Sequence, residues 1–254
     1  NCSHIFNYQK KMKISKVIIT STLDKKYLDY WPIVEKAWKE LDIEPILYLI
    51  TNKKYNNIQC QNFYIKKIHP VFIAQNLRML IPAIYPDDVC LLSDIDMMPL
   101  SKDYFQGSIK DIEDNNFFVY RSNATPDNML PICWNVALGS TWGQVFSIKN
   151  LDDITSKLID WYPKNYKPYK KNWYVDQIKL KECLSRFELS NSSRVVYQND
   201  ENLNFKRLNR DSLEKDFLDF KKEKSRYVDF HMARPFLGNQ VLIDQVFNLN
   251  FSEK

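Results

Sequence analysis

The chain has 254 residues, of which 44% are hydrophobic and 26% are charged, as in an ordinary globular protein. Its 36 basic and 31 acidic residues leave a net charge of only +5, which argues against a nucleic-acid-binding protein. No stretch reaches the roughly 18–20 apolar residues that span a bilayer, and the N-terminal residues lack the apolar segment of a signal peptide. We therefore expect a cytoplasmic protein without a transmembrane segment.

The first half of the chain alternates between expected strands and expected amphipathic helices. Apolar residues recur with helical spacing along residues 27–41 and 73–84. Pro32 fits the first helix only within its first turn, and Pro82 should end or kink the second. The expected strands are residues 16–22, 46–50, 63–68 and 89–92. This β-α-β alternation predicts an α/β fold with a parallel, Rossmann-like central sheet flanked by helices.

The second half of the chain has a less regular pattern. The expected strands are residues 117–120, 134–138, 194–197 and 227–230, and the expected helices are residues 150–161, 173–186 and 239–248. The chain contains no internal repeat, no low-complexity tract and no composition typical of a linker. We therefore predict an N-terminal extension over residues 1–15 and a single domain over residues 16–254.

The most informative motif is Asp94-Ile-Asp96, which directly follows the apolar run from Val89 to Leu92. It places two carboxylates at the C-terminal end of a buried strand, where open α/β sheets bind their ligands. A divalent cation such as Mg²⁺ is commonly held by one or two carboxylates together with substrate phosphates. The alternative is that one aspartate caps a helix that begins near Ser101.

Two later motifs contain further candidate site residues. In Phe230-His-Met-Ala-Arg-Pro-Phe236, His231 is a candidate metal ligand and Arg234 a candidate phosphate-binding residue. The alternative is a core histidine next to an unrelated surface arginine. Asp176 and Gln177 lie in the first turn of an expected helix, where an aspartate also suits the helix dipole without any further role.

Two other features each have two interpretations. Arg78 lies on the expected helix before the acidic motif, where it is either a site residue or a solvated helix charge. The segment from Trp134 to Gly143 holds two of the four glycines, so its backbone either turns in a hairpin or comes close to a ligand.

Taken together and in this order, the motifs resemble those of GT-A glycosyltransferases. The likeness is to the retaining enzymes of the glycogenin and lipooligosaccharide galactosyltransferase type, and to short viral domains that decorate capsid glycans. It rests on an Arg-bearing helix before D-x-D, an Asn- and Gly-containing segment, a D-Q pair, and a C-terminal His followed by a basic residue, Pro and an aromatic residue. It extends from about residue 16 to residue 240.

The resemblance implies a role for each candidate residue. Asp94, Asp96 and His231 would hold Mn²⁺ or Mg²⁺. Asp94 could instead contact the ribose of a nucleotide-sugar donor, with UDP as its carrier. Arg78 and Arg234 would bind the nucleotide and its phosphates. The base pocket would be lined by Thr20, Ser21 and Thr22. The donor or acceptor sugar would be contacted by Asn135, Gly139 and Trp142.

The resemblance also implies the chemistry, in which a sugar moves from its nucleotide diphosphate to a glycan or another hydroxyl acceptor. In a retaining enzyme Gln177 or Asp176 would support the cationic sugar, and in an inverting enzyme Asp176 would be the general base. We favour retention. The alternatives are another metal-dependent phosphoryl- or nucleotidyl-transfer enzyme, and a non-catalytic module that binds sugar or nucleic acid.

Overall fold

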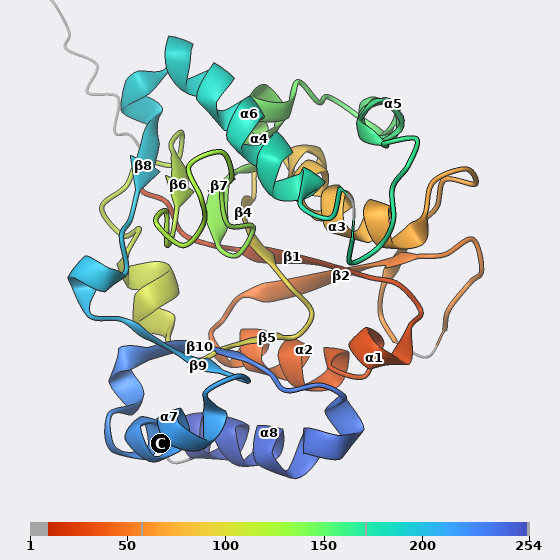
Figure 1. Ribbon diagram of the computed structural model, residues 1–254. Coiled ribbons are helices and arrows are strands. Elements are labelled where there is room, and N and C mark those ends of the chain that lie inside the picture. The colour runs from red at the N-terminus through yellow and green to blue at the C-terminus, as the bar shows by residue number, and fades with distance from the viewer. Residues whose placement is uncertain (1–9, 57, 171, 253–254) are drawn as a thin grey trace, which may run out of the picture.

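The computed structural model describes residues 10–56, 58–170 and 172–252, which form two sheets enclosed by helices (Figure 1). Within these residues the central sheet has the strand order β3-β2-β1-β4-β7-β6-β8. Its strands are β1 (Lys16–Ser21), β2 (Glu44–Ile50), β3 (Gln61–Phe63), β4 (Val89–Ser93), β6 (Phe117–Val119), β7 (Asn135–Leu138) and β8 (Val195–Tyr197). The first four strands in this series, β1 to β4, run parallel, and β7 is antiparallel to both of its neighbours. The predicted α/β class with a mixed, mainly parallel sheet is confirmed.

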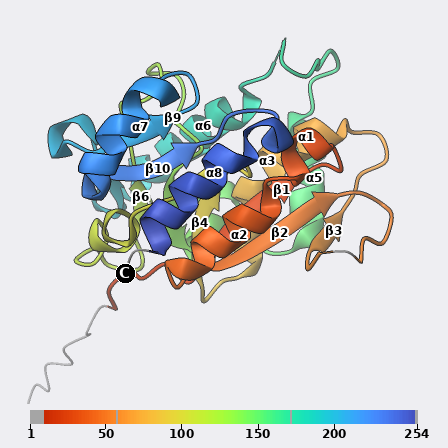
Figure 2. The same ribbon diagram turned by 90° about the horizontal axis from the view of Figure 1, so that it is seen from below.

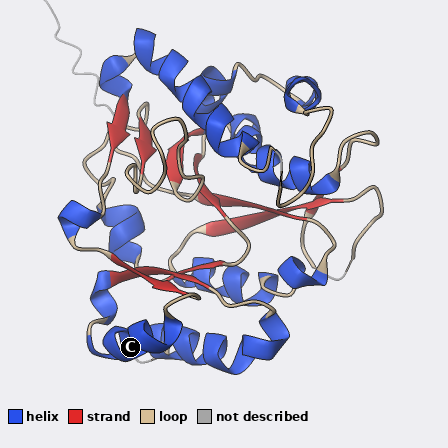
Figure 3. Ribbon diagram, viewed as in Figure 1, coloured by secondary structure: helices blue, strands red, loops and turns tan. Residues whose placement is uncertain are grey.

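Helices cover both faces of the central sheet (Figures 1 and 3). One face carries α3 (Pro70–Leu80), α4 (Gly139–Phe146), α5 (Leu151–Trp161) and α6 (Val175–Ser190). The opposite side carries α1 (Lys25–Leu28) and α2 (Trp31–Glu40). Short 3-10 turns occupy Ile81–Ile84, Ser192–Arg194, Glu201–Leu203 and Lys224–Arg226, and a π-helical turn spans Asp103–Gly107.

A smaller sheet lies on the same side as α2. It consists of β5 (Met97–Pro99), β10 (Tyr227–His231) and β9 (Lys206–Asn209), in that order. The helices α7 (Leu213–Lys222) and α8 (Phe236–Phe251) lie beyond it. Figure 2 shows α8 next to α2, and the two helices are in contact. The last fifth of the chain, from β9 onwards, therefore packs against the side of the central sheet that carries α2.

The alternation of side chains along the central strands separates the core into two layers. Val17 and Ile19 of β1 join the layer on the side of α2 and the small sheet, whereas Ile18 joins the layer on the side of α3 to α6. Leu91 and Leu92 of β4 divide in the same way. Because strands with two covered faces read as continuous apolar runs, these segments were recognisable as buried strands.

Two expected elements differ from the structure. The helix expected over residues 27–41 is divided into α1 and α2, because Pro32 has no backbone N–H to donate and fits only the start of a helix. The strand expected over residues 63–68 is instead β3, which ends at Phe63. Phe63 pairs with Ile50, the last residue of β2, so the following residues have no neighbouring strand with which to pair.

The segment from Trp134 to Gly143 does not form a hairpin. It forms β7 and then enters α4 at Gly139, whose N–H donates to the carbonyl of Asp88 over 2.8 Å. A Cβ atom at position 139 would lie 1.9 Å from the carbonyl oxygen of Tyr85 and 2.5 Å from that of Pro82. Glycine is required here because two stretches of backbone approach each other closely.

Cys60, Cys90, Cys133 and Cys183 are free thiols, and Cys2 lies outside the described residues. Residues 1–9 of the predicted N-terminal extension also lie outside them, while Met12 and Ile14 pack into the core layer beside α2.

Among the described helices, none combines the length and the apolar character needed to cross a membrane.

We predict that Gly139→Ala destabilises the protein by about 1–3 kcal/mol or more, because the added methyl group would overlap rigid backbone. Gly107→Ala is the matched control, since its Cβ would find nothing closer than 3.9 Å. Denaturant unfolding of both variants measures the difference, and equal stability of the two would contradict this account of Gly139.

Candidate functional site

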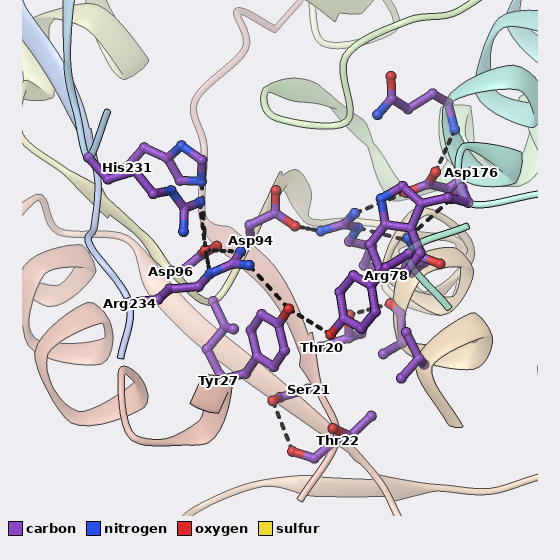
Figure 4. Close-up of a pocket in the computed structure, with 18 residues that line it drawn as sticks. Thr20, Ser21, Thr22, Tyr27, Arg78, Asp94, Asp96, Asp176, His231 and Arg234 are labelled. Atoms are coloured by element: carbon purple, nitrogen blue, oxygen red, sulfur yellow. Dashed lines mark hydrogen bonds and ion pairs between the residues drawn. The ribbon is translucent and has the colours of Figure 1, made fainter. Parts of the chain in front are cut away.

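A cavity of about 350 Å³ opens at the C-terminal edge of β1 and β4 (Figure 4). Its wall contains every residue predicted to bind the nucleotide, the metal or the reacting sugar carbon. These residues are Thr20, Ser21, Thr22, Arg78, Asp94, Asp96, Asp176, Gln177, His231 and Arg234. They are separated by up to about 200 positions in the chain, so their convergence is a property of the fold.

Parallel pairing of β1 and β4, together with the packing of α3 and α6, brings the first group of these residues together. Ile19 of β1 pairs with Ser93 of β4, so the hydroxyl-rich end of β1 lies beside the acidic motif that follows β4. The helix α3 packs on β1 and carries Arg78 towards the same edge. Asp176 lies in the first turn of α6, where its carboxylate accepts from Arg78 Nη2 over 3.0 Å.

The small sheet brings in the remaining residues. In the antiparallel pair of β5 and β10, His231 is opposite Met97, and the N–H of Met232 donates to the carbonyl of Asp96. In the parallel pair of β9 and β10, Asn209 is the neighbour of His231, and the next residue is Arg210. One short sheet therefore places Asp96, His231 and Arg210 side by side.

Asp96 is the most heavily contacted acid in the cavity. Its Oδ2 accepts from Arg234 Nε over 3.0 Å, from Arg234 Nη2, and from Arg210 Nη2 over 3.1 Å. Burial acts to raise the pKa of Asp96, but the attraction of Arg234 and the other neighbouring groups outweighs it and holds that pKa below its usual value. Asp96 is therefore an ionised carboxylate with arginine counter-ions.

Arg78 joins the two other acids of the cavity. One of its terminal nitrogens pairs with Asp94 Oδ1 and the other with Asp176 Oδ2. Burial raises the pKa of Asp176, and the guanidinium of Arg78 opposes that shift. Arg78 itself is only 8% exposed, so it is a buried counter-ion rather than a solvated helix charge.

A thiol supports the other side of Asp94. The backbone N–H of Asp94 donates to Cys133 Sγ over 3.1 Å, and the thiol donates back to Asp94 Oδ2 over 3.2 Å. Burial raises the pKa of Cys133 to about 12, so the sulfur keeps its proton at neutral pH and remains a donor. Cys133 and Arg78 together orient the carboxylate of Asp94.

The predicted metal ligands meet only in part. His231 Nε2 lies 3.6 Å from Asp96 Oδ2, and two donors about 2.1 Å from one ion can be up to about 4.2 Å apart. Burial lowers the pKa of His231 to about 4, so its imidazole is neutral, as a metal ligand must be. Asp94 instead turns to Arg78 (Figure 4). Within the described residues, no three His, Cys, Asp or Glu side chains form a metal-binding group.

The residues expected to contact a donor or acceptor sugar lie outside the cavity wall. Trp142 is fully buried, and its Nε1 donates to the carbonyl of Cys90 over 3.2 Å. Asn135 is also fully buried and donates to the carbonyls of Pro131 and Ile132. Gly139 occupies the tight backbone crossing described above. All three support the packing of β7 and α4, and none of them lines the cavity.

The cavity wall also contains residues that the sequence analysis did not assign to the site. They are Tyr27, Gln75, Trp173 and Arg210. Tyr27 fitted a helical apolar face and was assigned to the core. Arg210 lies next to β9, a strand that the apolar pattern did not predict. Tyr169, which also lines the cavity, lies in the run of residues 166–171, which is rich in tyrosine and lysine. Such a composition suits either a solvated loop or a surface that stacks a sugar ring or a base.

Comparison with known proteins identifies the fold. No family model matches the chain, and no curated protein matches it. The glycosyltransferase GlyE of Streptococcus pneumoniae TIGR4 has a similar structure, with a TM-score of 0.50, 13% identity, and coverage of 94% of this chain and 60% of GlyE. The chain has the predicted GT-A fold and spans 60% of the length of that relative.

Two further solved structures are similar at lower scores. One is a glycosyltransferase involved in the glycosylation of the major capsid of PBCV-1, with a TM-score of 0.49, 10% identity, and coverage of 91% of this chain and 99% of that one. The other is the galactosyltransferase LgtC, with a TM-score of 0.45, 12% identity, and coverage of 92% and 95% respectively.

We predict that His231 makes folding stability depend on pH between about 6.5 and 4. The unfolded chain binds the imidazole proton near pH 6.5, whereas the folded protein binds it only near pH 4. Unfolding therefore takes up a proton in this window, and stability falls as the pH is lowered.

Lowering the pH from 7 to 5 should reduce the free energy of unfolding of the wild type. In His231→Gln this reduction should be smaller by up to about 1–2 kcal/mol. Denaturant unfolding at both pH values measures this difference. An unchanged pH slope in the variant would show that the folded protein does not depress the pKa of His231.

Proposed function

We propose that the protein is a metal-dependent glycosyltransferase that moves a sugar from a nucleotide-diphosphate sugar, with UDP as carrier, to a hydroxyl group of a glycan or another acceptor. The supporting observation is the convergence in one cavity of all ten residues that the resemblance to GT-A enzymes assigned to nucleotide, metal and reacting sugar. The GT-A fold shared with GlyE agrees with this proposal.

The charges of the cavity suit a diphosphate together with a divalent cation. Its wall has three arginines and three aspartates, and His231 is neutral, so the cavity has no net charge of its own. A divalent cation and a diphosphate carrying two negative charges would preserve this balance. Asp96 and His231 would hold the cation, and Mn²⁺ suits a carboxylate–imidazole pair better than Mg²⁺ does. When bound, such an ion withdraws charge from the leaving diphosphate.

Arginines position the donor in this proposal. Arg234 is 41% exposed and already donates to the hydroxyl of Tyr27 over 3.2 Å, so its guanidinium reaches the open part of the cavity. Its planar fork matches two phosphate oxygens. Arg210 supplies a second guanidinium next to it. Arg78, held between Asp94 and Asp176, would direct both carboxylates towards the sugar hydroxyls.

The reaction breaks the bond between the anomeric carbon and the phosphate oxygen, and the electron pair leaves with the diphosphate. The sugar passes through an oxocarbenium-like state as the acceptor oxygen bonds to the anomeric carbon. In the retaining reaction that we favour, Gln177 supports the cationic sugar and the acceptor proton passes to a phosphate oxygen of the leaving group. In an inverting reaction Asp176 would take that proton.

We predict that the wild type hydrolyses at least one nucleotide sugar with Mn²⁺ and loses this activity in EDTA. Asp96→Asn should lower the rate by about 100-fold or more, because the ion and the guanidinium groups lose their common carboxylate. Asp87→Asn is the control, since Asp87 is exposed just before β4 and outside the cavity wall. Hydrolysis of a panel of UDP-, GDP-, ADP- and CMP-sugars is the measurement. Absence of nucleotide-sugar binding in Mn²⁺ would refute the proposal.

We predict a transfer product with the same anomeric configuration as the donor. Gln177→Ala should then slow transfer more than it weakens donor binding, because the amide acts on the cationic sugar and not on the nucleotide. Proton NMR of the first product formed gives the configuration. An inverted product would exclude the retaining role of Gln177 and would assign the general base to Asp176.

A further inference from the structure

We propose that Tyr169 and Trp173 form a ring-stacking platform that binds the base of the donor nucleotide, and that Gln75 positions this platform. The inference rests on the proposed function and adds to it a specific contact for the nucleoside. Both aromatic residues line the cavity, and neither belongs to a helix or strand.

The two rings are stacked on each other at the cavity wall. Their centroids are 4.5 Å apart and their planes differ by 27°. Tyr169 is 58% exposed, so much of its surface can contact a ligand. Its backbone has a φ of 60°, in the left-handed region that bulky residues rarely adopt. Such strain persists only where the surrounding contacts impose it, and it is common at ligand-binding sites.

Gln75 on α3 supplies two of those contacts. Its Oε1 accepts from the hydroxyl of Tyr166 over 2.8 Å, and its Nε2 donates to the carbonyl of Trp173 over 3.2 Å. Gln75 therefore hydrogen-bonds to residues on both sides of Tyr169 in the sequence, and it lies on the same helix as Arg78. This arrangement holds the platform in a constant position relative to the charged part of the cavity.

The platform lies close to Arg234, the proposed phosphate-binding arginine. The hydroxyl of Tyr27 accepts from Arg234 Nη1 over 3.2 Å and shares a hydrogen bond of 2.8 Å with the hydroxyl of Tyr169 (Figure 4). One tyrosine hydroxyl thus separates the guanidinium from the platform. The hydroxyl-rich end of β1, at Thr20, lines the same cavity and offers polar groups to the edge of a base.

These observations favour a base over the ring of an acceptor sugar. A base and a diphosphate belong to one molecule, so a stacking surface and an anion-binding arginine joined by two hydrogen bonds fit a nucleotide directly. Every nucleobase has a flat face that can stack on an aromatic ring. The platform therefore strengthens nucleotide binding and leaves the choice among bases to the polar groups around it.

The test compares nucleoside diphosphates with pyrophosphate, which lacks a base. Isothermal titration in Mn²⁺ gives the dissociation constants of UDP, CDP, GDP, ADP and pyrophosphate for the wild type. For the tightest nucleotide, Trp173→Ala should raise the dissociation constant by about tenfold, and that of pyrophosphate by less than about twofold. Trp173→Phe keeps a ring and should restore most of the nucleotide affinity.

Tyr174→Ala is the matched control, because this neighbouring aromatic residue is exposed but does not line the cavity. It should change neither affinity. Gln75→Leu should weaken the nucleotide more than pyrophosphate, as expected of a positioning residue. Thermal unfolding of each variant verifies that the fold is intact.

The outcomes separate this inference from the proposed function. If neither a nucleotide nor pyrophosphate binds the wild type, the proposed function fails and the platform fails with it. If nucleotides bind but Trp173→Ala weakens both ligands equally, or neither, the platform is refuted while the glycosyltransferase proposal stands. Slower transfer to an acceptor with unchanged nucleotide affinity would assign the rings to the acceptor and would also refute the inference.

Discussion

The site depends on a single oxygen atom, Oδ2 of Asp96. Two arginines donate to it and His231 lies 3.6 Å away, although the aspartate follows β4 of the central sheet and its three partners come from the last fifth of the chain. An ionised carboxylate buried to this degree would be unstable without such partners. Asp96 therefore joins the small sheet to the central sheet and provides the charge around which a ligand would bind.

The charged groups of the cavity form two clusters. One is centred on Asp96 and lies beside the small sheet, whereas the other is centred on Arg78, between α3 and α6. The stacked rings of Tyr169 and Trp173 line the same cavity. In the proposed function, the Asp96 cluster would face the diphosphate and the rings would face the base.

The elements with strong apolar patterns were predictable, and the weakly patterned ones were not. Val89 to Leu92 reads as a buried strand because both of its faces are covered, and Pro82 marks the end of α3 because it cannot continue a helix. By contrast, β9 has one buried residue among four, and β5 has only three residues. Neither strand therefore shows a detectable alternation of apolar and polar residues. Arg210 was missed for the same reason, since its position depends on the pairing of β9 with β10.

Residue order alone established the α/β class, the acidic pair at the end of a strand, and the motifs that belong together. These are local properties, because strand periodicity, a proline and a carboxylate after an apolar run need only neighbouring residues. Only the tertiary structure decided which partner each charge has: Arg78 with Asp94 and Asp176, and Arg234 with Asp96. It also placed Trp142 and Gly139 in the packing of α4, because contact between distant segments depends on how sheets and helices pack in three dimensions.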